Sequence, residues 1–174
     1  MSEEDSVALV FDATVLSNFA SSDSIDWLTT EFDQIYTVPA VRDEIAQGID
    51  TGHAFLEPAQ TALDAGKFQI PAVDSTVADR FESERDRLDR GEFEAFLLAW
   101  ENGWTLVTDD AAGRRVAKDK DVDVTGSIGL LVRGVVRGDL LLTLANEWLH
   151  TWTTERGYYA PVDSVNDVLP DDYE

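Results

Sequence analysis

The chain has 174 residues, enough for one domain with its own hydrophobic core, because a domain of roughly 150 residues buries about two-thirds of the surface exposed by its unfolded chain. It contains no cysteine, which excludes disulfides, thiolate zinc sites and cysteine nucleophiles, and its two histidines, His53 and His150, form no HxxxH or HxH pair. The formal net charge of −22 reflects 35 acidic against 13 basic residues, so a bound metal should be held by oxygen ligands.

Apolar runs of strand length alternate along the chain with patterns of helical period, which predicts strands that alternate with helices. The expected strands are 7–11, 35–38, 68–70, 105–108 and 122–124. The expected helices are 16–20, 25–28, 39–48, 53–66, 76–88, 92–100, 111–118, 128–137 and 139–152. Because this alternation is typical of α/β proteins, we expect a mostly parallel sheet with helices on both of its faces.

Several helix ends are assigned from single residues that favour caps or stops. Ser24 is expected to cap the helix that follows it, and Gly48 to end the helix after the second strand. Gly91 should separate a charged helix over 76–88 from the apolar helix that comes next. Asp139 should begin the last helix.

The C-terminal region contains aromatic residues whose role the sequence leaves open: Trp148, Trp152, Tyr158 and Tyr159. They either pack the last helix on the core or lie in the interface of a homodimer, and a homodimer is the assembly that we expect. We take residues 1–155 as one domain and 156–174 as a turn-rich tail that packs on this domain or in the interface.

Acidic residues stand where the predicted strands end. Asp12 directly follows the first strand, and Asp109 and Asp110 follow the strand that ends at 108. Glu44 lies early in the helix after the second strand, and Glu92 begins the helix that leads to the 105–108 strand. Ligands bind beyond the carboxyl ends of parallel strands, where carboxylates that meet without basic partners repel one another. A hard cation such as Mg²⁺ or Mn²⁺ would relieve this repulsion.

Each of these residues also has a simpler interpretation, since one residue in five is acidic. Asp12 and the Asp109-Asp110 pair can cap helices, and Glu44 can be a solvated helical residue. Glu92 and its neighbour Glu94 can complement the dipole of the helix that they begin. The spacing alone therefore leaves both a metal site and a set of helix-terminal acids open.

Four segments, taken in order, resemble the PIN domain family, and the resemblance extends from Val7 to about Asp139. They are Val10-Phe-Asp-Ala-Thr-Val-Leu16, Val38-Pro-Ala-Val-Arg-Asp-Glu-Ile45, Leu88-Asp-Arg-Gly-Glu-Phe-Glu-Ala95 with Leu98-Ala99, and Leu106-Val-Thr-Asp-Asp-Ala-Ala-Gly-Arg-Arg-Val-Ala117. A trailing Val124-Thr-Gly-Ser-Ile-Gly-Leu-Leu131, followed by Gly138, is similar to the branch of the family with a GE-x-EA helix and a late G-(S/T)-x-G turn.

The resemblance implies a three-layer α/β/α sandwich and a ribonuclease that depends on Mg²⁺ or Mn²⁺. Toxins of VapBC-type pairs and RNA-processing endonucleases are examples in the family, so RNA and an antitoxin protein are the implied partners. The residues that match the four acidic ligands, and thus the metal-binding catalytic set, are Asp12, Glu44, Glu92 and Asp110. Asp109 and Glu94 are neighbours that could replace two of them, and Thr14 matches the small polar residue that supports the first aspartate.

Arg114 and Arg115 would bind the substrate phosphate, or else belong to a solvated helical face. The net charge opposes RNA binding at low salt, because Lys and Arg provide the nonspecific affinity for nucleic acid. The acid-rich, lysine-poor composition resembles that of proteins from extreme halophiles, since molar salt reduces the Debye length to about 3 Å and screens self-repulsion. An ordinary acidic cytosolic protein is the alternative.

Two other functions compete with a ribonuclease. The first is a non-catalytic PIN-like module that acts through a protein partner. The second is an aspartyl-phosphate phosphatase of the haloacid dehalogenase kind, but that family needs Asp-x-Asp, whereas the first strand here is followed by Asp12-Ala13-Thr14. The first residues contain no basic region or apolar run of signal-sequence length, and no run could span a membrane, so we expect a cytoplasmic protein.

Overall fold

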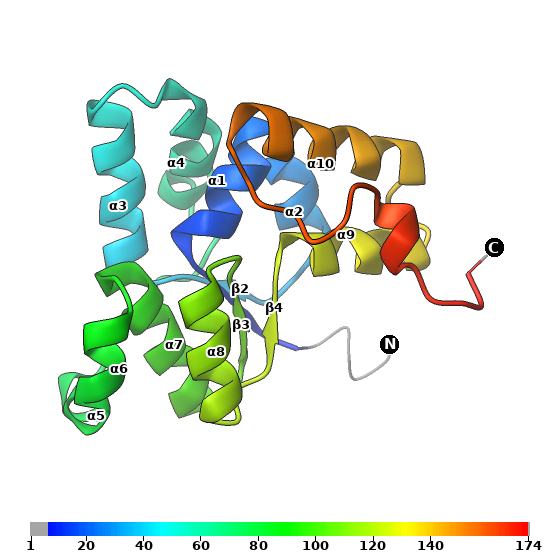
Figure 1. Ribbon diagram of the computed structural model, residues 1–174. Coiled ribbons are helices and arrows are strands. Elements are labelled where there is room, and N and C mark those ends of the chain that lie inside the picture. Colours follow the sequence, from blue (N-terminus) through cyan, green and yellow to red (C-terminus); the bar gives the residue numbers. More distant parts are fainter. Residues whose placement is uncertain (1–6, 174) are drawn as a thin grey trace.

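The computed structural model describes residues 7–173 (Figure 1), so positions 1–6 of the expected domain and Glu174 of the expected tail lie outside the described residues. Four parallel strands form one sheet in the order β2-β1-β3-β4. The strands are β1 Leu9–Phe11, β2 Ile35–Tyr36, β3 Thr105–Val107 and β4 Val124–Thr125. Register pairs Leu9 with Ile35 on one side and with Thr105 on the other. The expected strand over 68–70 is reduced to an isolated bridge between Tyr36 and Gln69.

Helices lie on both sides of this sheet (Figure 1), which confirms the expected α/β/α arrangement. The α-helices are α1 Ala13–Ser21, α2 Ile25–Glu31, α3 Pro39–Asp50, α4 Glu57–Asp64, α5 Ser75–Ala78, α6 Glu82–Arg87, α7 Arg90–Asn102, α8 Ala111–Asp119, α9 Ser127–Val136 and α10 Leu142–Glu155. Residues 7–173 also contain the 3₁₀ turns Ala54–Leu56, Asp79–Phe81 and Val165–Val168. Helix α7 packs against β1 and β3, and α1 packs against α10, α2 and α9. Within residues 7–173, no helix is both long and apolar enough to cross a membrane.

The last helix is anchored in the core by one aromatic residue. Trp152 is fully buried, its ring centroid lies 5.0 Å from that of Phe19, and its Nε1 donates a hydrogen bond to Ser22 Oγ at 3.0 Å. Trp148 also packs near Phe19, with 6.5 Å between ring centroids. Of the two interpretations of the C-terminal aromatic residues, core packing therefore describes Trp152, whereas Tyr159 is 94% exposed.

The prediction that Gly48 ends its helix is wrong. Gly48 lies inside α3, where a Cβ atom would come within 2.5 Å of Leu56 Cδ1, so glycine lets the following 3₁₀ turn pack closely on the helix. The chain turns at Gly52 instead, whose φ of +106° lies in the region that glycine adopts without steric cost.

The predicted single helix over 76–88 is also wrong, because the segment is broken into α5, a 3₁₀ turn and α6. Phe81 leaves the helical region with φ −127° and ψ 45°, and its buried ring packs edge-on against Phe96 and Trp100, at centroid distances of 5.3 and 4.9 Å. The apolar spacing of this segment favours one continuous helix, but burial of the Phe81 ring against Phe96 and Trp100 accompanies a break in the helix at Phe81.

Two helix-start predictions need correction as well. Ser24 occupies the position before α2, but its hydroxyl donates to the Phe19 carbonyl and caps nothing. Asp139 precedes the last helix, because its amide bonds to the Gly134 carbonyl at the end of α9, and α10 begins only at Leu142.

Candidate active site

Asp12 is the buried centre of a polar cluster at the carboxyl ends of β1 and β3. Its amide bonds to the Val107 carbonyl at 3.1 Å, which holds the residue against the neighbouring strand, and its carboxylate caps α1 by accepting from Val15 N at 3.3 Å. Thr14 Oγ1 donates to Oδ1 at 2.6 Å, and Thr108 Oγ1 donates to Oδ2. Burial raises the pKa of Asp12 to about 7 despite these hydrogen bonds, and the charge of Asp109 adds to the shift.

Thr108 connects Asp12 to Asp110. The Thr108 side chain is buried at the end of β3, and while its hydroxyl donates to Asp12 it accepts a bond from the Asp110 amide at 3.1 Å. Asp110 is the N-cap of α8, where its Oδ2 accepts from Gly113 N at 2.9 Å. The first and fourth predicted acids therefore belong to one hydrogen-bonded network, although Asp110 also has the capping role of the simpler interpretation.

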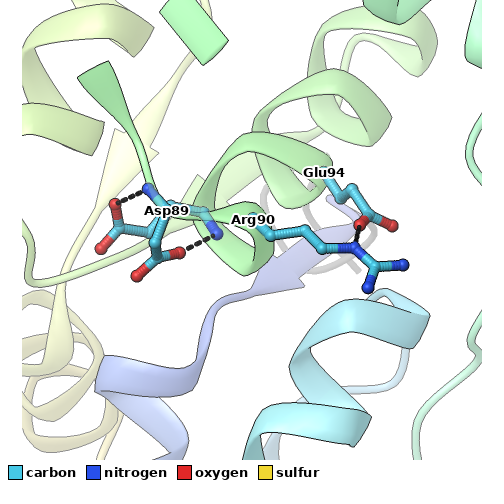
Figure 2. A network of polar contacts seen from close by, with 4 residues as sticks. Asp89, Arg90 and Glu94 are labelled. Carbon is cyan, nitrogen blue, oxygen red and sulfur yellow. Dashed lines mark hydrogen bonds and ion pairs between the residues drawn. The ribbon is translucent and has the colours of Figure 1, made fainter. Parts of the chain in front are cut away.

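Glu92 lies at the start of α7, in a capping box with Asp89. Asp89 Oδ1 accepts from Glu92 N at 2.8 Å, and Glu92 Oε2 accepts from Asp89 N at 3.3 Å (Figure 2). Glu92 is half-buried, and its pKa is raised to about 8, first by burial and then by the charges of Asp89, Asp110 and Asp12. Glu92 therefore shares the electrostatic environment of Asp110 and Asp12.

Glu94 points to the opposite side of α7. Its Oε2 accepts from Arg90 Nε at 2.9 Å, an ion pair that Figure 2 shows directed away from Asp89. Glu94 and Arg90 line a separate pocket, together with residues of α5 and α6. Of the two neighbouring glutamates, the one that shares an environment with Asp12 is therefore Glu92.

Glu44 lies on α3 beside the first turn of α7, close to Gly91 and Asp89. It is exposed, and its pKa is raised by partial burial of the carboxyl and then by the charge of Asp89. A Cβ atom at Gly91 would lie 3.1 Å from Glu44 Oε1 and 3.2 Å from Val41 Cγ2. Gly91 thus lies within α7 and permits close approach of α3, so the prediction that it separates two helices is wrong.

Asp109 faces α1 and α9 and is held by three hydrogen bonds. Asn18 Nδ2 donates to its Oδ2 at 2.9 Å, Ser127 Oγ donates to the same oxygen at 2.5 Å, and Ser127 N donates to Oδ1 at 2.7 Å. Burial raises its pKa against the effect of these bonds. Its amide also donates to Thr14 Oγ1 at 3.1 Å, so Thr14 joins Asp109 to Asp12.

The two predicted phosphate-binding residues differ in their surroundings. Arg114 is half-buried on α8, and its Nη1 donates to the Thr108 carbonyl at 3.3 Å, which holds the guanidinium next to the acidic cluster. Arg115 is exposed on the same helix. Arg114 therefore lies where a phosphate at the cluster could reach it.

The donor set fits a hard cation. Within residues 7–173, no three acidic or histidine side chains are already arranged as a metal-binding group. The raised pKa values of Asp12 and Glu92 nevertheless show carboxyls that are costly to charge where they stand. The ion pairs among the described residues, which involve Glu94, Glu84, Glu31 and Asp139, include none of the four predicted ligands. Carboxylate oxygens of this kind suit Mg²⁺ or Mn²⁺.

Sequence reasoning missed the residues that support these acids. Asp89 contributes a fifth carboxyl, and the pattern Asp-x-x-Glu at 89–92, a capping-box signature, could have found it. Thr108, Asn18 and Ser127 hold Asp12 and Asp109 through their side chains. Ser127 stands in the G-(S/T)-x-G turn of the resemblance, but no local pattern marks Thr108 and Asn18, because their partners lie more than 90 residues away.

A family model described as DUF3368: PIN domain matches residues 8–172, a range that includes every residue of the cluster. No curated protein matches the chain.

Proposed function

Because the chain belongs to the PIN domain family, we propose that it is a divalent-metal-dependent endoribonuclease that hydrolyses RNA phosphodiesters. The observation that carries the proposal is the buried Asp12, joined through Thr108 to Asp110 by hydrogen bonds. The charges of both residues also raise the pKa of Glu92. Burial first, and then neighbouring negative charge, raise the pKa values of Asp12 and Glu92. Carboxyls that are costly to ionise in this way are suited to hold a cation, because the cation stabilises their charged form.

In this mechanism Asp12, Glu44, Glu92 and Asp110 hold Mg²⁺ or Mn²⁺. When bound, the metal would supply an activated water and neutralise charge on the phosphodiester oxygens. Thr14 and Thr108 orient the two oxygens of Asp12 by donating one hydrogen bond to each. Glu92, with a pKa of about 8, would have to give up its proton in order to serve as a ligand. Arg114 binds a phosphate of the substrate beside the cluster.

The geometry favours one member of each ambiguous pair. Glu92 shares the surroundings of Asp12, whereas Glu94 is paired with Arg90 on the other side of α7. Asp110 raises the pKa of Glu92, whereas Asp109 uses its two oxygens on Asn18 and Ser127. We therefore assign Glu92 and Asp110 as ligands and Asp109 as a positioning residue.

Cleavage of RNA by the purified protein tests the proposal. With Mn²⁺, the wild type should cut a single-stranded RNA and Asp12→Asn should not, while both show the same circular dichroism spectrum. Cleavage at the same rate by Asp12→Asn would refute the assignment. If the wild type neither cleaves RNA nor binds metal, the result would support the alternative of a non-catalytic binding module.

The biological setting is also proposed. We infer a cytoplasmic toxin of a toxin–antitoxin pair, with a small antitoxin as partner, a homodimer as the assembly, and residues 1–155 as the catalytic domain. The net charge of −22 supports function at high salt, as in halophilic organisms, because repulsion between like surface charges is then screened. An open reading frame for a DNA-binding antitoxin beside the gene would support the toxin assignment.

A further inference from the structure

A pocket of about 450 Å³ adjoins the acidic cluster on the side of β4 and α9. Its lining includes Asp109, Arg114, Gly126, Tyr158 and Tyr159. The volume lies within the range of small-molecule sites, about 300–1,000 Å³. Two larger pockets, of about 670 and 520 Å³, are lined by none of the four proposed metal ligands. This pocket is distinguished by sharing Asp109, the neighbour of a proposed ligand.

One wall of the pocket is suited to an anion. Arg114 uses one N–H on the Thr108 carbonyl, and a guanidinium has five such donors. A Cβ atom at Gly126 would lie 2.7 Å from both Arg114 Nη1 and Asp109 Oδ1, so glycine is required for the guanidinium to lie against this turn. Gly126 is also the N-cap of the ten-residue helix α9, whose first turn lines the pocket and adds positive potential.

The negative charge of Asp109 does not cancel this wall. Its two oxygens accept hydrogen bonds from Asn18 Nδ2, Ser127 Oγ and Ser127 N, which are donors on α1 and α9. Because these bonds stabilise the carboxylate locally, Arg114 is not its main partner, and no ion pair within 4.0 Å joins the two among the described residues. Arg114 is therefore available to a second anion.

Two aromatic rings also line the pocket. The chain after α10, in orange to red in Figure 1, returns to α9, and its residues Tyr158 and Tyr159 line the pocket. Tyr158 stacks on the buried Trp152, with 6.1 Å between ring centroids and 26° between ring planes, so its ring is held in place. Burial and the charge of Asp109 raise its pKa, so the phenol keeps its proton as a hydrogen-bond donor. Tyr159 is 94% exposed and packs on no other ring in residues 7–173.

We propose that this pocket binds one nucleotide of a single-stranded RNA, with a phosphate on Arg114 and the base against Tyr158 and Tyr159. A guanidinium beside exposed aromatic rings is the combination by which proteins hold unpaired nucleotides. The inference rests on the proposed function for its substrate class, and it names where the substrate is held beyond the scissile bond. It also gives a chain of net charge −22 a local site that favours RNA.

Equilibrium binding of a short, fluorescently labelled single-stranded RNA in EDTA tests the pocket without cleavage. Tyr159→Ala should weaken binding about tenfold at every salt concentration, because base–aromatic stacking contributes this much per base. Tyr159→Phe keeps the ring and should bind like the wild type. Arg114→Ala should weaken binding and reduce the slope of log affinity against log salt by about 1, because one phosphate contact is lost. Arg87→Ala, which removes an exposed arginine of α6, is the matched charge control.

The proposal is overturned if Tyr159→Ala binds like the wild type, if Arg114→Ala loses no more affinity than Arg87→Ala, or if the wild type binds no RNA. Tyr159 is almost fully exposed, so its replacement keeps the test valid even if Arg114→Ala does not fold. Cleavage with Mn²⁺ is scored separately. Normal binding by the pocket variants of an active nuclease refutes only the pocket. Lost binding, combined with equal cleavage by wild type and Asp12→Asn, refutes only the proposed nuclease centre.

Discussion

Replacing Asp12 by asparagine is expected to stabilise the metal-free protein while it abolishes cleavage. Asp12 is fully buried, and its pKa of about 7 compares with 3.8 for an unperturbed aspartate. A group with a raised folded-state pKa binds protons more tightly in the folded chain, so stability falls as the pH rises from the unfolded to the folded pKa. With 1.36 kcal/mol per pKa unit, the raised pKa of Asp12 lowers the free energy of unfolding by about 4 kcal/mol at pH 8 and by about 2 kcal/mol at pH 5, relative to strongly acidic pH.

Asparagine keeps the shape of the side chain and carries no charge, so Asp12→Asn should recover part of this cost at pH 8. Urea unfolding at pH 8 and pH 5, in EDTA, measures it: the variant should be more stable than the wild type, and by a larger margin at pH 8. Asp74→Asn is a matched control, because Asp74 also caps a helix, but it is exposed and its hydrogen bonds to Thr76 lower its pKa. That variant should gain no stability at pH 8.

Metal should reduce the stability advantage of Asp12→Asn over the wild type. At about 100 times its dissociation constant, Mn²⁺ adds about 2.7 kcal/mol to a protein that binds it only when folded. The wild type should gain this stability and Asp12→Asn should not. The reasoning about a costly carboxylate is refuted if Asp12→Asn is no more stable than the wild type at pH 8. The reasoning about a metal ligand is refuted if Mn²⁺ stabilises both proteins equally.

Four further outcomes are expected. Glu92→Gln should lose cleavage with Mn²⁺ and Glu94→Gln should keep it, because of the two only Glu92 shares the electrostatic environment of Asp12; equal rates in a cleavage assay would contradict this. Gly91→Ala should change the free energy of unfolding by less than about 1 kcal/mol, since alanine favours helix, yet lower the cleavage rate, because the new Cβ displaces the Glu44 carboxyl. Thr108→Val should cost about 1–3 kcal/mol in urea unfolding, because a buried hydroxyl that bonds two partners is lost. The melting temperature should rise with KCl concentration, as screening of a −22 charge requires, and a flat profile would speak against halophilic adaptation.

The sequence alone could not decide which of two neighbouring acids is the ligand, either for Glu92 and Glu94 or for Asp109 and Asp110. Residues two apart on a helix are roughly 200° apart around its axis, so Glu92 and Glu94 face opposite sides. Which side meets Asp12 depends on how α7 docks on β1 and β3. Asp109 and Asp110 likewise separate only because α9 brings Ser127 to one of them and the amide of Gly113 binds the other.

The effect of a glycine on a helix also could not be predicted from its neighbours in the sequence. Gly48 and Gly91 are helix stops by local propensity, but each lies inside a helix because a neighbouring element, at Leu56 or Glu44, occupies the space of a Cβ atom. Phe81 breaks a segment of helical period because its ring is buried against Phe96 and Trp100.

The sequence by itself determined the alternation of strands and helices, the parallel sheet and the acids at the strand ends, because these depend on local hydrophobic period and on where a strand stops. The resemblance of four motif segments indicated the family. Only the tertiary structure decided which acids share an environment, what supports them, and that the C-terminal tyrosines line a pocket beside them. Asp12 and Thr108 are 96 positions apart, and their contact exists because β1 and β3 are adjacent in the sheet. Burial and charge repulsion arise from such contacts, so the raised pKa values that mark the site are properties of the fold.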